Sequence, residues 1–174
     1  MAFKNRFLIY RKFFIASLVI YILSFISGAL ISNFLNFDLL PHTEAFDDLL
    51  YHNLILGLKL MVFGWISLGV LNTICLGYNG IFLGTLTFSI VKHHGFTPIL
   101  TGILPHGIIE IFAFLLFSTI GFESLRYVDF LKKKAKHDNK ITYQKSIKNS
   151  IFVIVLAVIL LLIAAWIETY ISHI

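Results

Sequence analysis

The chain has few of the groups that keep a folded protein in water. Only 13% of its 174 residues are charged, whereas 58% are hydrophobic and mean hydropathy is +0.88. A folded domain of this size leaves much of its surface in contact with solvent, so it cannot bury that much apolar side chain in its own core. A soluble globular domain is thereby excluded, and the composition indicates an integral membrane protein.

Cysteine is almost absent as well. The single residue, Cys75, excludes an internal disulfide and any metal site built from several thiolates. Because it lies in an apolar segment, we interpret it as a small packed residue. The net charge of +5 would suggest nucleic acid in a soluble protein, but here the basic residues flank apolar runs. We therefore attribute them to membrane orientation and lipid headgroups, and expect no nucleic-acid partner.

Apolar runs long enough to cross a bilayer recur along the whole chain. They predict an all-α, polytopic helix bundle that forms one membrane domain over residues 1–174. A tight turn is expected at residues 75–80, which makes the third span short, and Pro105 is expected to interrupt the fourth. Paired short or interrupted segments are typical of helices that line a polar site. The five predicted spans cover residues 13–35, 54–74, 78–92, 97–122 and 150–170.

The charges between these runs predict the orientation of the chain. Residues 1–12 hold four basic and no acidic side chains, and residues 123–149 hold eight basic against three acidic ones. Both segments are therefore expected in the cytoplasm. Residues 36–53 have acidic but no basic side chains, so they and the C-terminus are expected outside. We also predict a short surface helix over residues 42–52 and a last span that faces lipid.

Small residues recur every four positions in two of the runs. Ser24, Gly28 and Ser32 form one such stripe, and Gly80 with Gly84 form another. A stripe of this kind lets a neighbouring membrane helix approach closely. We therefore predict tight helix packing at both.

An imidazole and a carboxylate stand in the fourth apolar run. Residues 101–110 read Thr-Gly-Ile-Leu-Pro-His-Gly-Ile-Ile-Glu. Pro105 suits the first turn of a helix, and His106 and Glu110 are four residues apart, so they share one helix face. Ionisable groups at membrane depth are costly and mark functional sites by default. We therefore predict a polar centre around this pair, inside the bundle.

Three roles remain open for the pair. The two side chains can bond to each other and lock the bundle, or they can form a binding or catalytic centre in which the imidazole acts as a general base. They can also ligate a metal such as zinc. The candidate third ligand is then His52, with His93 or His94 as alternatives to it. Lys59, in the second span, either reaches the headgroups or pairs with Glu110.

Several short motifs between residues 51 and 121 resemble one family of membrane proteins. They are His52-Asn53, Tyr78-Asn79-Gly80 followed by Gly84, and Leu104-Pro105-His106-Gly107-Ile108-Ile109-Glu110. This pattern is similar to that of the stage II sporulation protein M family of bacterial membrane proteins. Beside the central His106 and Glu110, we assign substrate or partner binding to Asn53, Lys59, Asn79, Gly80, Gly84, Pro105 and Gly107.

The resemblance implies a function in the bacterial cell membrane. One member of that family recruits peptidoglycan-degrading partners in sporulation, and small members are encoded with circular bacteriocins, where they are implicated in maturation and export of a hydrophobic cationic peptide. Because this chain is short, we expect the second role. Its expected partners are such a peptide, other membrane proteins including ABC transporter components, and a second copy of itself. The alternatives are a zinc-dependent intramembrane peptidase or peptide cyclase, a sporulation scaffold, and a small permease.

Overall fold

The computed structural model describes residues 2–34, 45–135 and 143–172. These residues form helices and contain no strand, which confirms the predicted all-α class. Five helical segments are long and apolar enough to cross a membrane, as predicted. The elements are α1 (Ala2–Ser32), α2 (Phe46–Ile66), α3 (Val70–His94), the π-helical turn η1 (Ile99–Ile103), α4 (Leu104–Gly121), α5 (Glu123–Ala135) and α6 (Tyr143–Tyr170).

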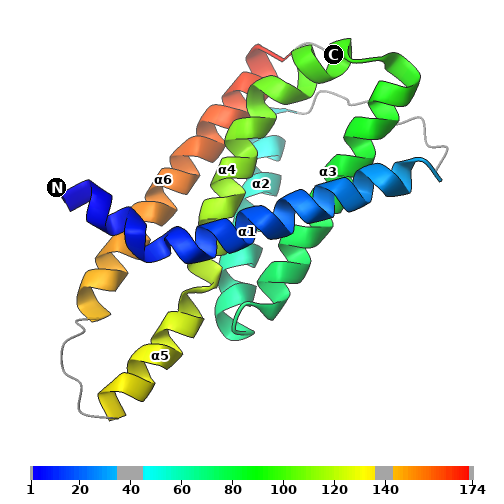
Figure 1. The fold of residues 1–174 in the computed structure, drawn as a ribbon. Helices are drawn as coiled ribbons and strands as arrows, with labels where there is room; N and C mark the ends of the chain where they lie inside the picture. Colours follow the sequence, from blue (N-terminus) through cyan, green and yellow to red (C-terminus); the bar gives the residue numbers. More distant parts are fainter. Residues whose placement is uncertain (1, 35–44, 136–142, 173–174) are drawn as a thin grey trace.

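Helix α4 lies at the centre of the bundle. Its residues 113–121 are all buried, and they combine with Leu60 of α2 and Leu161 of α6 in one apolar core. Helix α6 packs along α4, α2 contacts both of them, and α1 crosses the bundle obliquely and packs mainly on α3 (Figure 1). The largest share of buried residues among the five candidate spans belongs to the span that contains α4, which agrees with this central position.

The two small-residue stripes meet each other, as their spacing predicts. A side chain at Gly84 would collide with the backbone of Phe25, and one at Gly28 would collide with the backbone of Ile81. The Thr85 hydroxyl donates a hydrogen bond to the Gly28 carbonyl at 3.1 Å. Glycine thus allows α1 and α3 to touch backbone to backbone.

The predicted turn at residues 75–80 is wrong. The chain reverses at residues 67–69, where Leu68 and Gly69 have positive φ of 53° and 90°, and residues 75–80 lie inside α3. The third span is therefore a helix of 25 residues, not a short one. Gly80 has no side chain because it packs on Ser24 of α1, and not because the backbone turns there.

Other predicted boundaries need smaller corrections. Pro105 does lie in the first turn of α4, as expected, but η1 leads directly into it. Of the predicted surface helix, residues 46–52 instead begin α2, and residues 42–44 lie outside the described part. Helix α6 faces lipid on one side only, because Ala157 and Leu161 on its other side are fully buried. The assignment of the two membrane sides to cytoplasm and exterior stays a prediction.

Candidate functional site

His106 connects the start of α4 to the end of α6. The residue is 7% exposed, and its Nδ1 atom lies 3.1 Å from the Ser172 hydroxyl. Its Nε2 atom lies 3.7 Å from a carboxylate oxygen of Glu168, one turn earlier on the same chain segment. The Ser172 N–H donates to the Ile167 carbonyl at 2.9 Å, which holds Ser172 against the last turn of α6. An imidazole is thus held between a hydroxyl and a carboxylate.

Glu110 lies one helical turn beyond His106 and connects α4 to two further spans. Its side chain lies near the Asn53 side chain of α2 and near the acidic group of Glu168 on α6. It also interacts electrostatically with Tyr21 of α1, whose hydroxyl donates to Asn79 Oδ1 of α3 at 3.2 Å. Every one of the five spans therefore contributes to one set of polar side chains. We call this set the polar cluster: Tyr21, Asn53, Asn79, His106, Glu110, Glu168 and Ser172.

The polar cluster extends from one end of the bundle towards its middle. His106 is the third residue of α4 and Ser172 follows the end of α6, whereas Tyr21 and Asn79 lie in the middle of their helices. The Glu168 side chain is 22% exposed, so the cluster reaches the surface at that end. A charged group can therefore approach the carboxylates from the end of the bundle.

The polar cluster contains two acidic side chains and no lysine or arginine. It holds two carboxylates and one imidazole, and the imidazole carries a charge only when it is protonated. Lys59, the predicted ion-pair partner of Glu110, is exposed on α2 and makes no ion pair with that carboxylate, and both residues belong to the described part of the chain. The alternative interpretation, in which Lys59 extends to the headgroups, agrees with its exposure.

The geometry around His106 suits proton transfer as well as binding. An imidazole between a hydroxyl and a carboxylate can accept a proton on one nitrogen and release one from the other. Ser118, another hydroxyl near the sequence motif, is fully buried and bonds to Ser17 of α1 at 2.8 Å, so it is not accessible to a substrate.

The described residues contain no group of three His, Cys, Asp or Glu side chains that is arranged to hold a metal ion. His52 is exposed in the second turn of α2, and His93 and His94 are exposed at the end of α3. Zinc ligation by His106, Glu110 and His52 stays a prediction to which this arrangement adds no support.

The other predicted site residues fall into two groups. Asn53 lies in the polar cluster, and Asn79 joins it because it accepts a hydrogen bond from Tyr21. Gly80 and Gly84 instead serve the contact of α1 with α3. Pro105 and Gly107 flank His106 on α4, and a side chain at Gly107 would meet only Ile103, at 3.5 Å.

Sequence reasoning missed three members of the polar cluster. Glu168 is the only acidic residue of the last span, and Ser172 follows it by four positions, so their spacing matches that of His106 and Glu110. That repeated spacing was a usable signal. Tyr21 gave none, because a single tyrosine among apolar residues is typical of any membrane helix.

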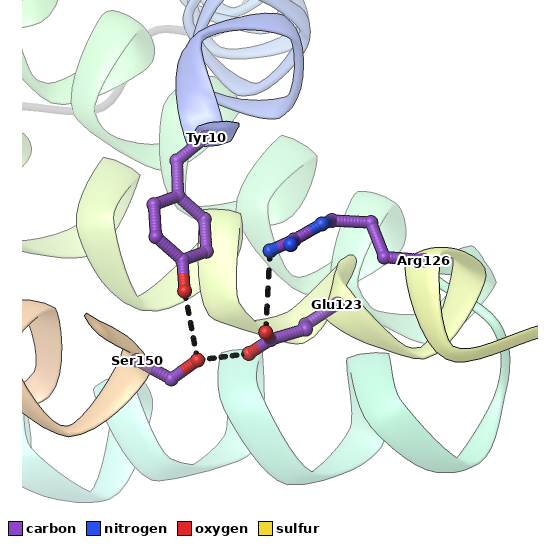
Figure 2. Close-up of polar contacts among 4 residues, drawn as sticks. All are labelled: Tyr10, Glu123, Arg126 and Ser150. Atoms are coloured by element: carbon purple, nitrogen blue, oxygen red, sulfur yellow. Dashed lines mark hydrogen bonds and ion pairs between the residues drawn. The ribbon is translucent and has the colours of Figure 1, made fainter. Parts of the chain in front are cut away.

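A second polar group lies at the opposite end of α4. Glu123 is 5% exposed and accepts hydrogen bonds from Ser150 of α6 and, at 3.2 Å, from Arg126 of α5. The Tyr10 hydroxyl of α1 lies 2.9 Å from the Ser150 hydroxyl, and the Arg126 guanidinium lies 5.1 Å from the centre of the Tyr10 ring. We call these four residues the Glu123 latch; Figure 2 shows how they join α1, α5 and α6.

Comparison with known proteins places the chain in a family. The sequence profile described as stage II sporulation protein M matches residues 11–173. The chain belongs to the stage II sporulation protein M family. The match to this family includes Tyr21, Glu168 and Ser172, whereas the motifs seen in the sequence covered only residues 51–121. With five candidate spans, this family member is a multi-pass membrane protein.

A relative of this stage II sporulation protein M family member is an uncharacterized protein of Methanocaldococcus jannaschii. The two chains are 32% identical over 167 residues, which is 91% of this chain and 92% of the relative. The similarity therefore extends over most of the chain. No solved structure matches the chain.

Proposed function

We propose that this protein is a non-catalytic membrane subunit that binds a hydrophobic, cationic peptide during its maturation and export. The observation that carries the proposal is the pair of carboxylates, Glu110 and Glu168, in a polar cluster to which every span contributes. The family membership supports the membrane setting, and the short chain is similar to the small members encoded beside circular bacteriocins.

Electrostatics explains why such a cluster favours a cation. Two carboxylates that interact with each other repel, and the repulsion is strongest where little water screens it. An ammonium or guanidinium group placed between Glu110 and Glu168 would relieve that repulsion and form charge-assisted hydrogen bonds with both. The ends of the helices give such a group access, because Glu168 is partly exposed there.

The apolar part of the peptide has a surface to follow as well. Helix α1 carries exposed apolar side chains along one face, among them Val19, Ile22 and Ile26. Tyr21, on the opposite face, belongs to the polar cluster. Apolar groups of the peptide can contact this face of α1, whereas its cationic groups would approach the cluster at the exposed Glu168 end.

Peptide binding by the full-length protein in lipid nanodiscs tests the proposal. The probe is a fluorescent synthetic helix of leucine, alanine and lysine, and its matched control carries glutamate in place of each lysine. We expect Glu168→Gln and Glu110→Gln each to weaken binding of the lysine peptide about tenfold, since a hydrogen bond to a charged group contributes roughly 1.5–3 kcal/mol.

The control variant for this experiment is Asp48→Asn. It removes one exposed carboxylate from the first turn of α2 and leaves the polar cluster intact. Equal affinities for the lysine and glutamate peptides, or equal losses in Asp48→Asn and Glu168→Gln, would contradict the proposal. Gene neighbours that encode a peptide precursor and an ABC transporter would support it, whereas sporulation genes would favour the scaffold role.

A second candidate function is acyl transfer by an intramembrane peptidase or cyclase. It is favoured by the arrangement of three side chains, in which the imidazole of His106 lies between the Ser172 hydroxyl, at 3.1 Å, and the Glu168 carboxylate, at 3.7 Å. In that role the Ser172 oxygen would attack a peptide carbonyl while His106 accepts its proton and later returns it to the leaving amine. A fluorophosphonate probe distinguishes the two functions, because only the enzyme would be labelled, and only while Ser172 is present.

A further inference from the structure

Helix α5 leaves the bundle at the end that carries the Glu123 latch. It begins at Glu123, and only Phe122 separates it from the last residue of α4. Within the described part, α5 packs on α2 and α4, and the Glu123 latch ties its first turn to α1 and α6. The candidate membrane span Ile99–Lys132 contains α4 and most of α5, but α4 is its apolar part and α5 is amphipathic, so we infer that α5 starts at the membrane surface.

One face of α5 is apolar and only partly covered by protein. Tyr127, Val128 and Leu131 lie within one angular sector of the helix, and Asp129 lies on the opposite side. Leu131 is 44% exposed, and Leu125, near the edge of the apolar face, is 40% exposed. A helix with this pattern beside a membrane span typically lies in the interface, with its apolar face towards the acyl chains.

Aromatic side chains indicate the same depth. The Tyr127 ring lies 5.9 Å from that of Trp65, which is in the last turn of the membrane span α2, and 6.5 Å from the ring of Phe130. Trp and Tyr gather at the level of the lipid headgroups. The start of α5 is therefore held at that level by a neighbouring span.

The charge of α5 fits an anionic surface. The helix ends in Lys132, Lys133 and Lys134, and its first acid, Glu123, is buried in the latch, where Arg126 and Ser150 bond to it. The latch thus removes a carboxylate from the surface at one end of the helix while the other end is basic. Three lysines at a membrane surface attract anionic lipids, each with a measurable gain in affinity.

We propose that α5 is an interfacial helix that binds anionic phospholipid headgroups through the basic C-terminal end of the helix, where Lys132 is exposed, with the Glu123 latch as the anchor of its first turn. The partner is the lipid phosphodiester. An acidic protein is the competing occupant of the same surface, and the depth of the helix distinguishes the two.

Spin labels test that depth in the full-length protein. Cys75→Ser removes the only cysteine, and Leu131→Cys or Asp129→Cys then places one label on either face of α5. In nanodiscs we expect the label at 131 to collide mainly with oxygen, which dissolves in lipid, and the label at 129 to collide mainly with a water-soluble nickel chelate. Equal access of the chelate to both labels would place α5 in water and overturn the proposal. Tight binding of a polyglutamate peptide to that water-exposed helix would then favour an acidic protein as the partner.

Lipid selection is tested by native mass spectrometry of protein released from mixed phosphatidylcholine and phosphatidylglycerol membranes. We expect the preference for phosphatidylglycerol to fall about fivefold for each lysine that is removed. The single variant Lys132→Gln removes one lysine, and a triple variant with glutamine at positions 132–134 removes three. Lys92→Gln, at the far end of α3, removes one charge away from α5 and should keep the preference. An unchanged preference in the triple variant, with the protein still monodisperse, would refute the role of these lysines.

Discussion

The contact between α1 and α3 gives the sharpest test of the fold, through the substitution Gly84→Ala. A Cβ atom at Gly84 would overlap the Phe25 carbonyl oxygen and lie 2.9 Å from its carbonyl carbon and 3.0 Å from the Ala29 nitrogen. All three atoms belong to the α1 backbone, so no side chain can rotate away. Helix α1 must move by about 1 Å to restore normal contact, and overpacking of this kind costs about 1–3 kcal/mol.

Helix propensity opposes that cost. Replacing glycine by alanine inside a helix stabilises it by about 1 kcal/mol. Because the added atom meets only backbone at Gly84, we place the clash in the upper part of its range, about 2–3 kcal/mol, and expect a net loss of about 1–2 kcal/mol. At Gly77 on the same helix, the added atom would meet only the Ser24 hydroxyl at 3.3 Å, which can rotate. Gly77→Ala is therefore expected to be neutral or stabilising.

Thermal unfolding in detergent, followed by circular dichroism, compares the two variants. For a chain of this size, 1 kcal/mol corresponds to a shift of roughly 2–4 °C in Tm, so Gly84→Ala should unfold about 2–8 °C below the wild type. Gly77→Ala should match or exceed the wild type. The reasoning fails if Gly84→Ala is as stable as Gly77→Ala, because α1 and α3 would then lie farther apart than the structure places them.

Three further predictions concern the turn, the latch and the core, and each is measured by the same unfolding assay. Gly69→Ala should lower the free energy of unfolding by about 1–3 kcal/mol, because φ is 90° at that position. Leu68→Gly should raise it by up to about 1 kcal/mol, because glycine adopts the φ of 53° without strain. Equal effects of the two substitutions would place the turn elsewhere. Glu123→Ala should cost about 1–3 kcal/mol, since it leaves buried donors without their acceptor, and a neutral result would argue against the latch. A double-mutant cycle of Ser17→Ala and Ser118→Ala should give a coupling of about 0.6 kcal/mol, and additive losses would mean that the two hydroxyls do not bond.

The fold could be predicted from the sequence as far as composition and spacing decide it. Five apolar runs predicted the five spans, and the four-residue repeats predicted two close helix contacts without showing that the two stripes would meet each other. The turn between α2 and α3 could not be located, because glycine has two uses in a membrane protein. Gly69 supports a positive φ, whereas Gly80 makes room for another helix, and only the packing partner distinguishes them.

The candidate site was predictable where its residues are close in sequence. His106 and Glu110 reveal themselves by their spacing on one apolar helix. Glu168 and Ser172 come from a span about 60 residues away, and nothing in the sequence shows that α6 lies along α4 or in which register. Contacts between distant segments depend on side-chain packing over the whole interface, which a local pattern does not contain.

The bundle itself supplies an argument against a purely structural role for the polar cluster. Ser17 and Ser118 bond at 2.8 Å, and the Asn72 amide donates to the Ser118 carbonyl at 2.9 Å, so uncharged groups already join α1, α3 and α4. Interhelical polar bonds in membranes contribute only about 0.6–2 kcal/mol each. Locking the helices therefore does not require two acidic side chains as well. Under the proposed function, a cation that binds beside Glu110 and Glu168 gives the two acids a reason to lie together.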